Sequence, residues 1–248
     1  MNARGGLSLL LAGAAAAAAT LAWTRGAPAD ESAAVAGAFA PPLLAASKGP
    51  DAPPVAAAST KLALFDGKSL TGWKQVLQDP KADPAKTWSV QDGVIKVTGK
   101  PAGYIRTEKS FKNYFLVVEW RWPAEAGNSG VLLHMQRDDK VWPYSVEAQL
   151  ESGNAGDFWL IDGATPQVDD ARRNPGAKIN VKHLAGAEKP LAEWNRYEIT
   201  CLDGAVILVV NGELVNYGRS AVPSEGFICL QSEGVPIEFR RVELTPIQ

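Results

Sequence analysis

Residues 61–248 are a succession of short β-type segments separated by turn signals, and this pattern narrows the fold to an all-β architecture. The clearest hairpin joins residues 197–202 to 205–210 through Asp203-Gly204, and a second turn follows at Asn211-Gly212. No stretch of this region has the periodicity of a long amphipathic helix. Further strands are indicated at 88–90, 94–97, 115–122, 131–135, 144–150, 213–216, 227–231 and 237–244. The regular strand spacing predicts an antiparallel two-sheet β-sandwich or jelly roll.

Three segments depart from this regular pattern. The apolar phase of the last strand shifts between Phe239 and Val242, which predicts a β-bulge at Arg240-Arg241. Residues 81–87 and 153–178 are polar and rich in Gly, Pro and Asp, so we expect them to be loops. Long loops on a rigid sandwich commonly carry function.

The N-terminal 60 residues have the composition of a leader and a tether. Arg4 precedes an apolar run from Leu7 to Ala22, and Ala27-Pro28-Ala29 has a small-x-small cleavage pattern. We therefore expect residues 1–29 to be a signal peptide, because the run is shorter than the roughly 20 residues of a spanning helix. Residues 30–60 are rich in Ala and Pro, which predicts a disordered linker before a single domain at 61–248. The expected location is periplasmic or secreted, with no stable membrane span after cleavage.

Charge and cysteine content exclude several classes of protein. The formal net charge is -2, and loss of Arg4 and Arg25 with the leader makes it more negative, which argues against a nucleic-acid partner. Cys201 and Cys229 are the only cysteines in the sequence. Two buried thiols are favoured, and a disulfide remains open because export permits one. No Cys/His zinc spacing, phosphate loop or Gly-x-Ser-x-Gly motif is present.

The segment 144–151 has the most informative polar pattern. Strand alternation places Val146, Ala148 and Leu150 on one face and Glu147, Gln149 and Glu151, with Ser145, on the other. Two acids on one strand face are typical of glycoside hydrolysis, which uses a pair of carboxyl groups. The Cα atoms of Glu147 and Glu151 would be about 13 Å apart, whereas retaining chemistry needs carboxyl groups about 5–5.5 Å apart. The alternative is an ordinary solvated strand face.

Other polar and aromatic side chains are candidates for the same groove. Trp142, Tyr144 and Trp159 flank the acidic strand and offer faces on which a sugar ring can stack. His134 is a polar residue in an otherwise apolar strand, so it is a candidate base or a satisfied structural residue. The turn-like segments 127–130 and 231–234 contribute further candidate substrate-binding side chains, namely Asn128, Gln231 and Glu233.

The order and spacing of several short motifs resemble a known family, the DUF1080 or 3-keto-disaccharide hydrolase domain, over roughly residues 64–246. The matching segments are Leu64-Phe65-Asp66-Gly67-Lys68-Ser69-Leu70-Thr71-Gly72-Trp73, Trp88-Ser89-Val90-Gln91-Asp92-Gly93, Gly127-Asn128-Ser129-Gly130-Val131, Val146-Glu147-Ala148-Gln149, Glu193-Trp194-Asn195, Asn211-Gly212 and Phe239-Arg240. The resemblance implies a concanavalin A-like jelly roll with a sugar-directed site on the concave sheet.

The chain departs from the family pattern at one acid. The family's Glu-x-Gln-x-x-Asp run appears as Glu147-Ala148-Gln149-Leu150-Glu151 followed by Ser152, so the final acid is shifted or replaced. The strand is also similar to the Glu-x-Asp-x-Glu signature of jelly-roll β-glucanases, with Gln149 in place of the central Asp. These differences make the role of Glu151 less secure than that of Glu147.

A 3-keto sugar, which the resemblance implies as substrate, permits cleavage by elimination. The ketone acidifies the C2 hydrogen, a base removes it, the C1 substituent leaves, and water then adds to the enone. Glu147 or His134 would be the base. Gln149, Asn128 or a bound divalent metal ion would hold the enolate oxygen. The residues do not establish a metal, because the spacing of His134, Glu147 and Glu151 is not diagnostic.

The leading hypothesis is therefore an exported hydrolase or lyase that cleaves 3-keto-disaccharides or related oxidised glycosides. Two alternatives are a non-catalytic carbohydrate-binding module and a retaining glycosidase that acts on unmodified β-glucan. The same sandwich serves all three, so fold alone does not separate them. The sequence leaves the linkage, the aglycone and the oligomeric state open.

Overall fold

The computed structural model describes residues 60–248, so the expected signal peptide and almost all of the expected linker lie outside the described residues. Regular structure in this part of the chain consists of sixteen strands and two short 3-10 helices, η1 (Pro84–Lys86) and η2 (Asp170–Arg172). All strand pairs are antiparallel. The all-β sandwich predicted from the sequence is confirmed.

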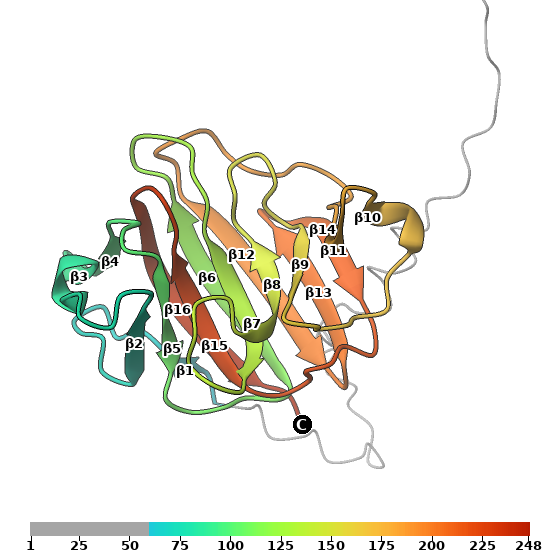
Figure 1. Ribbon diagram of the computed structural model, residues 1–248, viewed down its shortest axis with the longest axis horizontal. Helices are drawn as coiled ribbons and strands as arrows, with labels where there is room; N and C mark the ends of the chain where they lie inside the picture. The colour runs from blue at the N-terminus through green and yellow to red at the C-terminus, as the bar shows by residue number, and fades with distance from the viewer. Residues whose placement is uncertain (1–59) are drawn as a thin grey trace, which may run out of the picture. The chain divides into compact units, whose positions relative to one another are not determined.

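The strands form two eight-stranded sheets that stack as layers (Figure 1). Sheet A has the order β14 (Glu213–Gly218), β13 (Ala205–Val210), β12 (Asn195–Leu202), β6 (Tyr114–Arg121), β16 (Ile237–Pro246), β4 (Val94–Val97) and β3 (Trp88–Gln91), with β1 (Leu62–Ala63) paired to β16. Sheet B has the order β10 (Arg173–Asn174), β11 (Ala177–Val181), β9 (Phe158–Ile161), β8 (Tyr144–Gln149), β7 (Gly130–Gln136), β15 (Phe227–Ser232), β5 (Gly103–Thr107) and β2 (Trp73–Leu77).

The chain crosses between the sheets, from β5 in sheet B to β6 in sheet A and back to β7, so strands far apart in sequence become neighbours. β7 lies between β8 and β15, and this pairing brings residues near 130, 147 and 231 together. In the part of the chain that the structure describes, no helix is long and apolar enough to cross a membrane.

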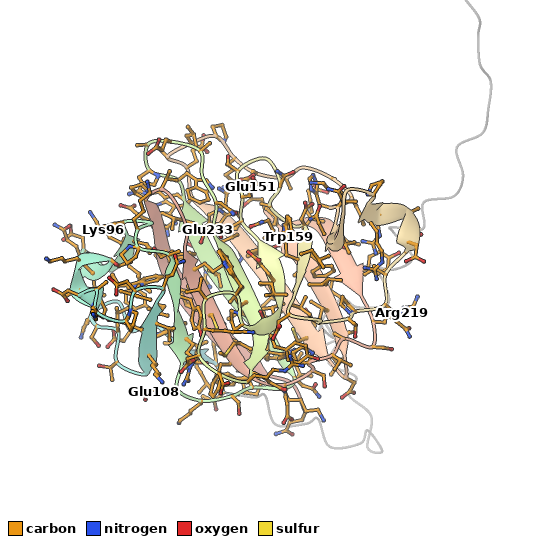
Figure 2. The ribbon with its side chains drawn as sticks, in the orientation of Figure 1. Lys96, Glu108, Glu151, Trp159, Arg219 and Glu233 are labelled. Atoms are coloured by element: carbon orange, nitrogen blue, oxygen red, sulfur yellow. The ribbon has the colours of Figure 1, made fainter. Side chains whose placement is uncertain are left out.

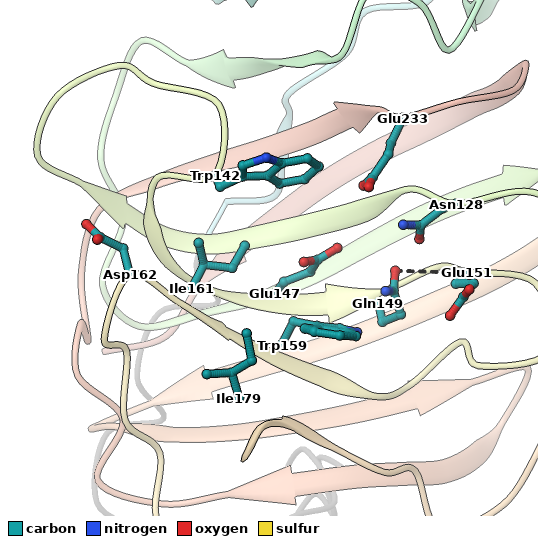
Figure 3. A pocket seen from close by; sticks show the side chains of 10 residues that line it. All are labelled: Asn128, Trp142, Glu147, Gln149, Glu151, Trp159, Ile161, Asp162, Ile179 and Glu233. Carbon is teal, nitrogen blue, oxygen red and sulfur yellow. Dashed lines mark hydrogen bonds between the residues drawn. The ribbon is translucent and has the colours of Figure 1, made fainter. Parts of the chain in front are cut away.

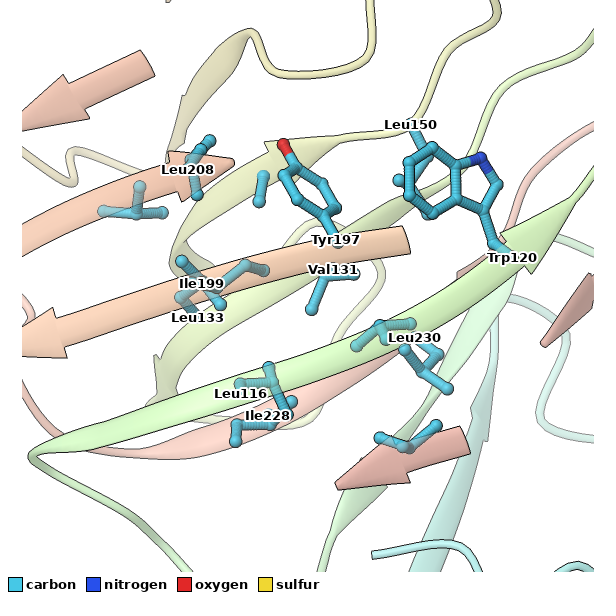
Figure 4. Close-up of a cluster of buried hydrophobic side chains, with 14 of the residues drawn as sticks. Leu116, Trp120, Val131, Leu133, Leu150, Tyr197, Ile199, Leu208, Ile228 and Leu230 are labelled. Carbon is cyan, nitrogen blue, oxygen red and sulfur yellow. The ribbon is translucent and has the colours of Figure 1, made fainter. Parts of the chain in front are cut away.

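The main hydrophobic core fills the space between the sheets. Alternate residues of facing strands bury their side chains here, including Leu116 and Trp120 of β6, Val131 and Leu133 of β7, and Ile228 of β15 (Figure 4). A second, smaller cluster lies on the opposite face of sheet B and contains Tyr104, Leu132, Met135 and Cys229. Because this outer cluster packs beside the polar residues of β8, part of the outer face of sheet B is also removed from water.

The predicted β-bulge in the last strand is confirmed. The register of β16 against β6 shifts between Arg240 and Val242, and Arg241 has a left-handed φ of 50°. The extra residue places two adjacent arginines on the outer face, where Arg240 Nε donates to Glu119 Oε2 at 2.7 Å and Arg241 Nη1 donates to Glu119 Oε1 at 3.3 Å.

The cysteines are free buried thiols, as the sequence favoured. Cys201 belongs to the core between the sheets, whereas Cys229 belongs to the small cluster on the outer face of sheet B. A disulfide is therefore absent because the two thiols lie in different packing clusters.

The prediction of a loop at 153–178 was wrong. This segment contains β9, β10, η2 and the start of β11, which extend sheet B beyond β8. The apolar run Phe158-Trp159-Leu160-Ile161 forms a strand even though Gly and Asp surround it, because β8 supplies a paired edge.

Candidate functional site

A pocket lies on the outer face of sheet B, and β8 contributes its central side chains. Val146 and Ala148 pack into the core, and alternation turns Glu147 and Gln149 to the opposite side. Figure 2 shows Glu151, Trp159 and Glu233 grouped over the middle of the sandwich, away from peripheral residues such as Lys96 and Arg219. The expected convergence of the side chains at 147, 149 and 151 is therefore present.

The pocket has a cavity volume of about 340 Å³. Its lining includes seven of the ten side chains expected from the sequence, namely Asn128, Trp142, Glu147, Gln149, Glu151, Trp159 and Glu233. Three further side chains complete it: Ile161, Asp162 and Ile179 (Figure 3).

Glu147 is the most buried acid of the pocket, with 4% of its surface exposed. Its Oε1 has no hydrogen-bond partner within the described residues. Burial, with the charges of Glu233 and Glu151 adding to it, raises the pKa of Glu147 well above its ordinary value. The carboxyl group therefore holds a proton at a pH where exposed acids have lost theirs.

A glycine on the neighbouring strand makes room for this carboxyl group. A Cβ at Gly130 would lie 2.1 Å from Glu147 Oε1 and 2.5 Å from Gln231 Oε1. Gly130 pairs with Gln149 in the β7–β8 ladder, so the Glu147 carboxyl group leans over the backbone of β7. The absence of a side chain at position 130 thus allows Glu147 to be buried in this position.

Gln149 presents a hydrogen-bond donor to the pocket. Its Oε1 accepts from the backbone N–H groups of Leu150, at 2.8 Å, and Glu151, at 3.0 Å (Figure 3). Because two donors face Oε1, the orientation of the amide is determined and Nε2 is its remaining polar atom. Gln149 can therefore donate to a ligand oxygen.

Glu233 and Asn128 enter the site from the ends of two other strands. They form an isolated antiparallel bridge beyond β15 and before β7. Burial raises the pKa of Glu233, a hydrogen bond from Asn128 opposes this shift, and the charge of Glu151 adds to it. The pocket thus holds two carboxyl groups whose affinity for a proton is increased.

Glu151 is oriented by a chain of polar contacts that leads away from the pocket. Asn154 Nδ2 donates to Glu151 Oε2 at 2.9 Å, and Lys182 Nζ donates to Asn154 Oδ1 at 3.1 Å. Lys182 Nζ also lies 2.9 Å from Oδ2 of the buried Asp157. Because Lys182 Nζ can only donate, it binds the oxygen of the Asn154 amide and leaves the nitrogen to donate to Glu151.

Asp157, which anchors Lys182, is itself held as a carboxylate. Burial raises the pKa of Asp157, but hydrogen bonds from Lys182, Asn180 and His183 bring the pKa below its ordinary value.

His134 does not join the pocket, contrary to its assignment as a candidate base. The register of β7 shifts between Leu133 and Gln136, and His134 has a φ of 55°, so the period-two alternation fails here. Its ring packs on Tyr114 of sheet A, and Nε2 donates to Lys112 O at 3.0 Å. Burial lowers the pKa of His134 to about 4. The residue is a neutral, structural side chain in this position.

Two expected substrate-binding residues also lie outside the pocket lining. Tyr144 packs into the main core, and the guanidinium of Arg137 covers its ring at 3.7 Å. Gln231 is buried beneath the pocket, beside Gly130 and Glu147. Tyr144 has no free face for stacking, and Gln231 lies below the pocket with no hydrogen-bond partner for its Oε1 among the described residues.

The residues of this site do not form a metal centre. Between residues 60 and 248, no group of three or more His, Cys, Asp or Glu side chains is arranged to hold a metal ion. His134, one of the three ligands considered from the sequence, points to the other side of the sheet from Glu147.

Three lining residues were not predicted from the sequence. Ile161 ends β9, Asp162 follows it, and Ile179 lies in β11, all within or just after the segment expected to be a loop. The apolar run at 158–161 was the available signal, because its alternation places Trp159 and Ile161 on one face.

Comparison with known proteins assigns the chain to a family. Residues 61–245 match the family model of the 3-keto-alpha-glucoside-1,2-lyase-like domain. The search of curated proteins gave no match.

Two solved structures from Parabacteroides distasonis, each provisionally described as a glycosyl hydrolase, are similar in fold. The first is 24% identical, with a TM-score of 0.57, and the match covers 76% of this chain and 94% of that one. The second is 21% identical, with a TM-score of 0.57 and coverage of 76% and 100%.

A carbohydrate-binding module, CBM66 from Bacillus subtilis, has the same fold at 12% identity, with a TM-score of 0.52 and coverage of 70% and 95%. At these identities the structural neighbours establish the fold alone. The family model covers most of the sequence, from the first strand to the penultimate residue of β16. The chain therefore belongs to the 3-keto-alpha-glucoside-1,2-lyase-like domain family, as the resemblance of its motifs implied.

Proposed function

We propose that this protein cleaves 3-keto glycosides by elimination of the C1 substituent, followed by hydration of the enone. The observation that carries the proposal is the buried, unpaired carboxyl group of Glu147 in a pocket shared with Glu233 and Gln149. Burying such a group lowers stability, so a module that only binds sugar gains nothing from it. A proton donor beside a second carboxyl group is what this elimination needs.

The first half of the reaction uses Glu147 as the acid and Glu233 as the base. The Glu233 carboxylate removes the C2 proton, and the electron pair moves to the C3 oxygen as an enolate. Gln149 Nε2 donates to that oxygen. The enolate then re-forms the C3 ketone and the C1=C2 bond, the C1–O bond breaks, and Glu147 protonates the departing oxygen. The products are the aglycone alcohol and an unsaturated 3-keto sugar.

The second half restores both carboxyl groups. The Glu147 carboxylate accepts a proton as water attacks C1, and Glu233, which is partly exposed and whose carboxyl proton exchanges with solvent between the two halves, protonates C2. The sum of the two halves is hydrolysis, with each residue back in its starting state. Glu233 replaces Glu151 in the pair considered from the sequence, because Asn154 Nδ2 already holds Glu151 Oε2 at 2.9 Å, whereas burial gives Glu233 an increased affinity for a proton.

The deciding experiment is turnover of a 3-keto-disaccharide in D2O, with release of 3-keto-glucose followed by mass spectrometry. We expect turnover with one deuterium incorporated at C2, because the C2 proton exchanges in the elimination. The unmodified disaccharide is the control and should remain intact. Release without deuterium would indicate direct displacement at C1, and no release would contradict the proposal.

Export to the periplasm or the medium is part of the proposal and rests on residues 1–29. Oxidised glycosides, rather than nucleotides or proteins, are the partners that the pocket chemistry fits.

Trp142 is expected to contribute to substrate binding at a conformational cost. It has a φ of 63° and 43% of its surface is exposed, so a bulky residue occupies the left-handed region at the pocket rim. Such strain costs about 1–3 kcal/mol. For Trp142→Gly we expect KM for a 3-keto glycoside to rise about tenfold, equivalent to about 1.4 kcal/mol, with little change in the free energy of unfolding.

Trp142→Ala is the matched control, since it removes the ring and keeps the Cβ. KM for the 3-keto glycoside should rise equally in both variants. The free energy of unfolding of the Ala variant, measured by chemical denaturation, should be about 1 kcal/mol lower than that of the Gly variant. Equal stability of the two variants would argue against strain, and an unchanged KM would argue against contact with substrate.

A further inference from the structure

The two ends of the pocket differ in chemistry. Figure 3 shows Glu233, Asn128 and Glu151 on one side of Glu147, and Trp142, Ile161 and Ile179 on the other. The acidic end contains the groups that the proposed reaction uses, so the keto sugar belongs there. The apolar end is contiguous with it and begins where a C1 substituent would leave the acid.

The apolar end is exposed in a way that core packing does not explain. Ile179 exposes 51% of its surface on β11, and Trp142 exposes 43%. Isolated exposed apolar residues are common, but contiguous ones at the rim of a pocket mark a ligand surface. Their presence beside the site indicates that a ligand covers them during function.

The acid at the apolar end of the pocket, Asp162, is already paired with two basic side chains. The carboxylate of Asp162 lies 3.0 Å from Arg137 Nη1 and 3.1 Å from Lys140 Nζ. The remaining surface is indole and isoleucine, which can stack on a ring but offer few hydrogen-bond partners to the hydroxyl groups of a second sugar ring. Hydroxyl groups placed against the isoleucine side chains would lose water and gain few partners, which is unfavourable.

We infer that the apolar end is an aglycone subsite, and that the preferred substrate is a 3-keto glycoside whose leaving group is an apolar, ring-sized alcohol. The inference rests on the proposed function and adds the substrate class. It makes Ile179 and Trp142 determinants of aglycone specificity, separate from the groups that move protons.

The test compares three 3-keto-α-glucosides with alkoxide leaving groups, whose aglycones are methanol, cyclohexylmethanol and glucose. Methyl and cyclohexylmethyl alkoxides leave with similar ease, so a difference in kcat/KM between them reports binding of the aglycone. We expect the cyclohexylmethyl glucoside to exceed the methyl glucoside at least tenfold and the glucosyl compound to resemble the methyl one. Equal values for all three, or a preference for glucosyl, would overturn the inference.

Ile179→Asn should remove most of the cyclohexylmethyl preference, measured as the ratio of kcat/KM for the cyclohexylmethyl and methyl glucosides. Leu184→Asn is the matched control, because Leu184 is similarly exposed, at 47%, and does not line the pocket. It should keep the full preference, and loss of preference in both variants would also overturn the inference.

Failure of the proposed function is distinguishable from failure of this inference. If none of the three compounds is cleaved, binding of cyclohexylmethyl and methyl 3-keto-α-glucosides is measured by calorimetry. Tighter binding of the cyclohexylmethyl compound that Ile179→Asn removes would support the subsite without the chemistry. Equal binding would overturn the subsite as well.

Discussion

Glu147→Gln is expected to reduce kcat for a 3-keto glycoside by about 10³-fold, within the range for loss of a general acid. Glutamine keeps the shape of the side chain and cannot donate a proton to the departing oxygen. Because binding uses the Trp rings and Gln149, KM should change much less than kcat. The measurement is steady-state kinetics of the purified variant with the 3-keto-disaccharide.

The same substitution should change how stability depends on pH. Glu147 has a folded-state pKa raised well above its ordinary value of 4.5. Its contribution to stability is therefore fully present below pH 4.5 and is lost as the pH rises toward the folded-state pKa, by about 1.4 kcal/mol per pH unit for a single site. Glu147→Gln removes this titration. The variant should thus gain thermal stability relative to the native protein as the pH increases from 5 to 8.

Glu213→Gln is the control for both effects, because Glu213 is exposed at the start of β14, away from the pocket. It should retain activity and the native dependence of Tm on pH. A Glu147→Gln variant with near-native kcat would remove Glu147 from the mechanism. A constant difference in Tm across this pH range would contradict a raised pKa.

Gly130→Ala is expected to reduce activity about 100-fold in a protein that still folds. The added Cβ would lie 2.1 Å from Glu147 Oε1 and 2.5 Å from Gln231 Oε1, so both side-chain ends must move. Displacing a catalytic group by about 1 Å costs on the order of 10² in rate. Both displaced atoms lie at the ends of flexible side chains, so the cost in stability should be only about 1–2 kcal/mol. Activity and chemical denaturation of the same preparation separate the two effects.

Gly218→Ala is the matched control, because Gly218 is also a glycine in a strand. Its added Cβ would meet Pro166 Cβ at 3.1 Å and Val168 Cγ1 at 3.2 Å, neither of which lines the pocket. Gly218→Ala should lower the free energy of unfolding slightly and leave kcat/KM of the folded protein unchanged.

The double variant Gly130→Ala/Glu147→Asp gives a second check. A shorter acid needs less of the space that the methyl group takes, so the two losses should be less than additive. Full activity of Gly130→Ala would show that the carboxyl group does not need its observed position.

The alternation of apolar and polar residues along the chain was sufficient to predict the β-sandwich and part of the candidate site. Period-two alternation from 144 to 151 separated Val146 and Ala148 from Glu147 and Gln149, and the structure confirms that division. The phase shift at Arg240-Arg241 located the bulge for the same reason. The alternation rule failed at His134, where a bulge and a left-handed φ turned the side chain away, and nothing in the neighbouring residues signals that change.

The sequence alone determined which side chains share a face of a strand, because that depends on a repeat of two residues. Tertiary structure decided which strands become neighbours, and so placed Glu233, Gly130 and Ile179 around Glu147 although they are distant in sequence. It also decided the protonation of Glu147, because burial and the proximity of other charges set a pKa, and both arise only when the sheets pack.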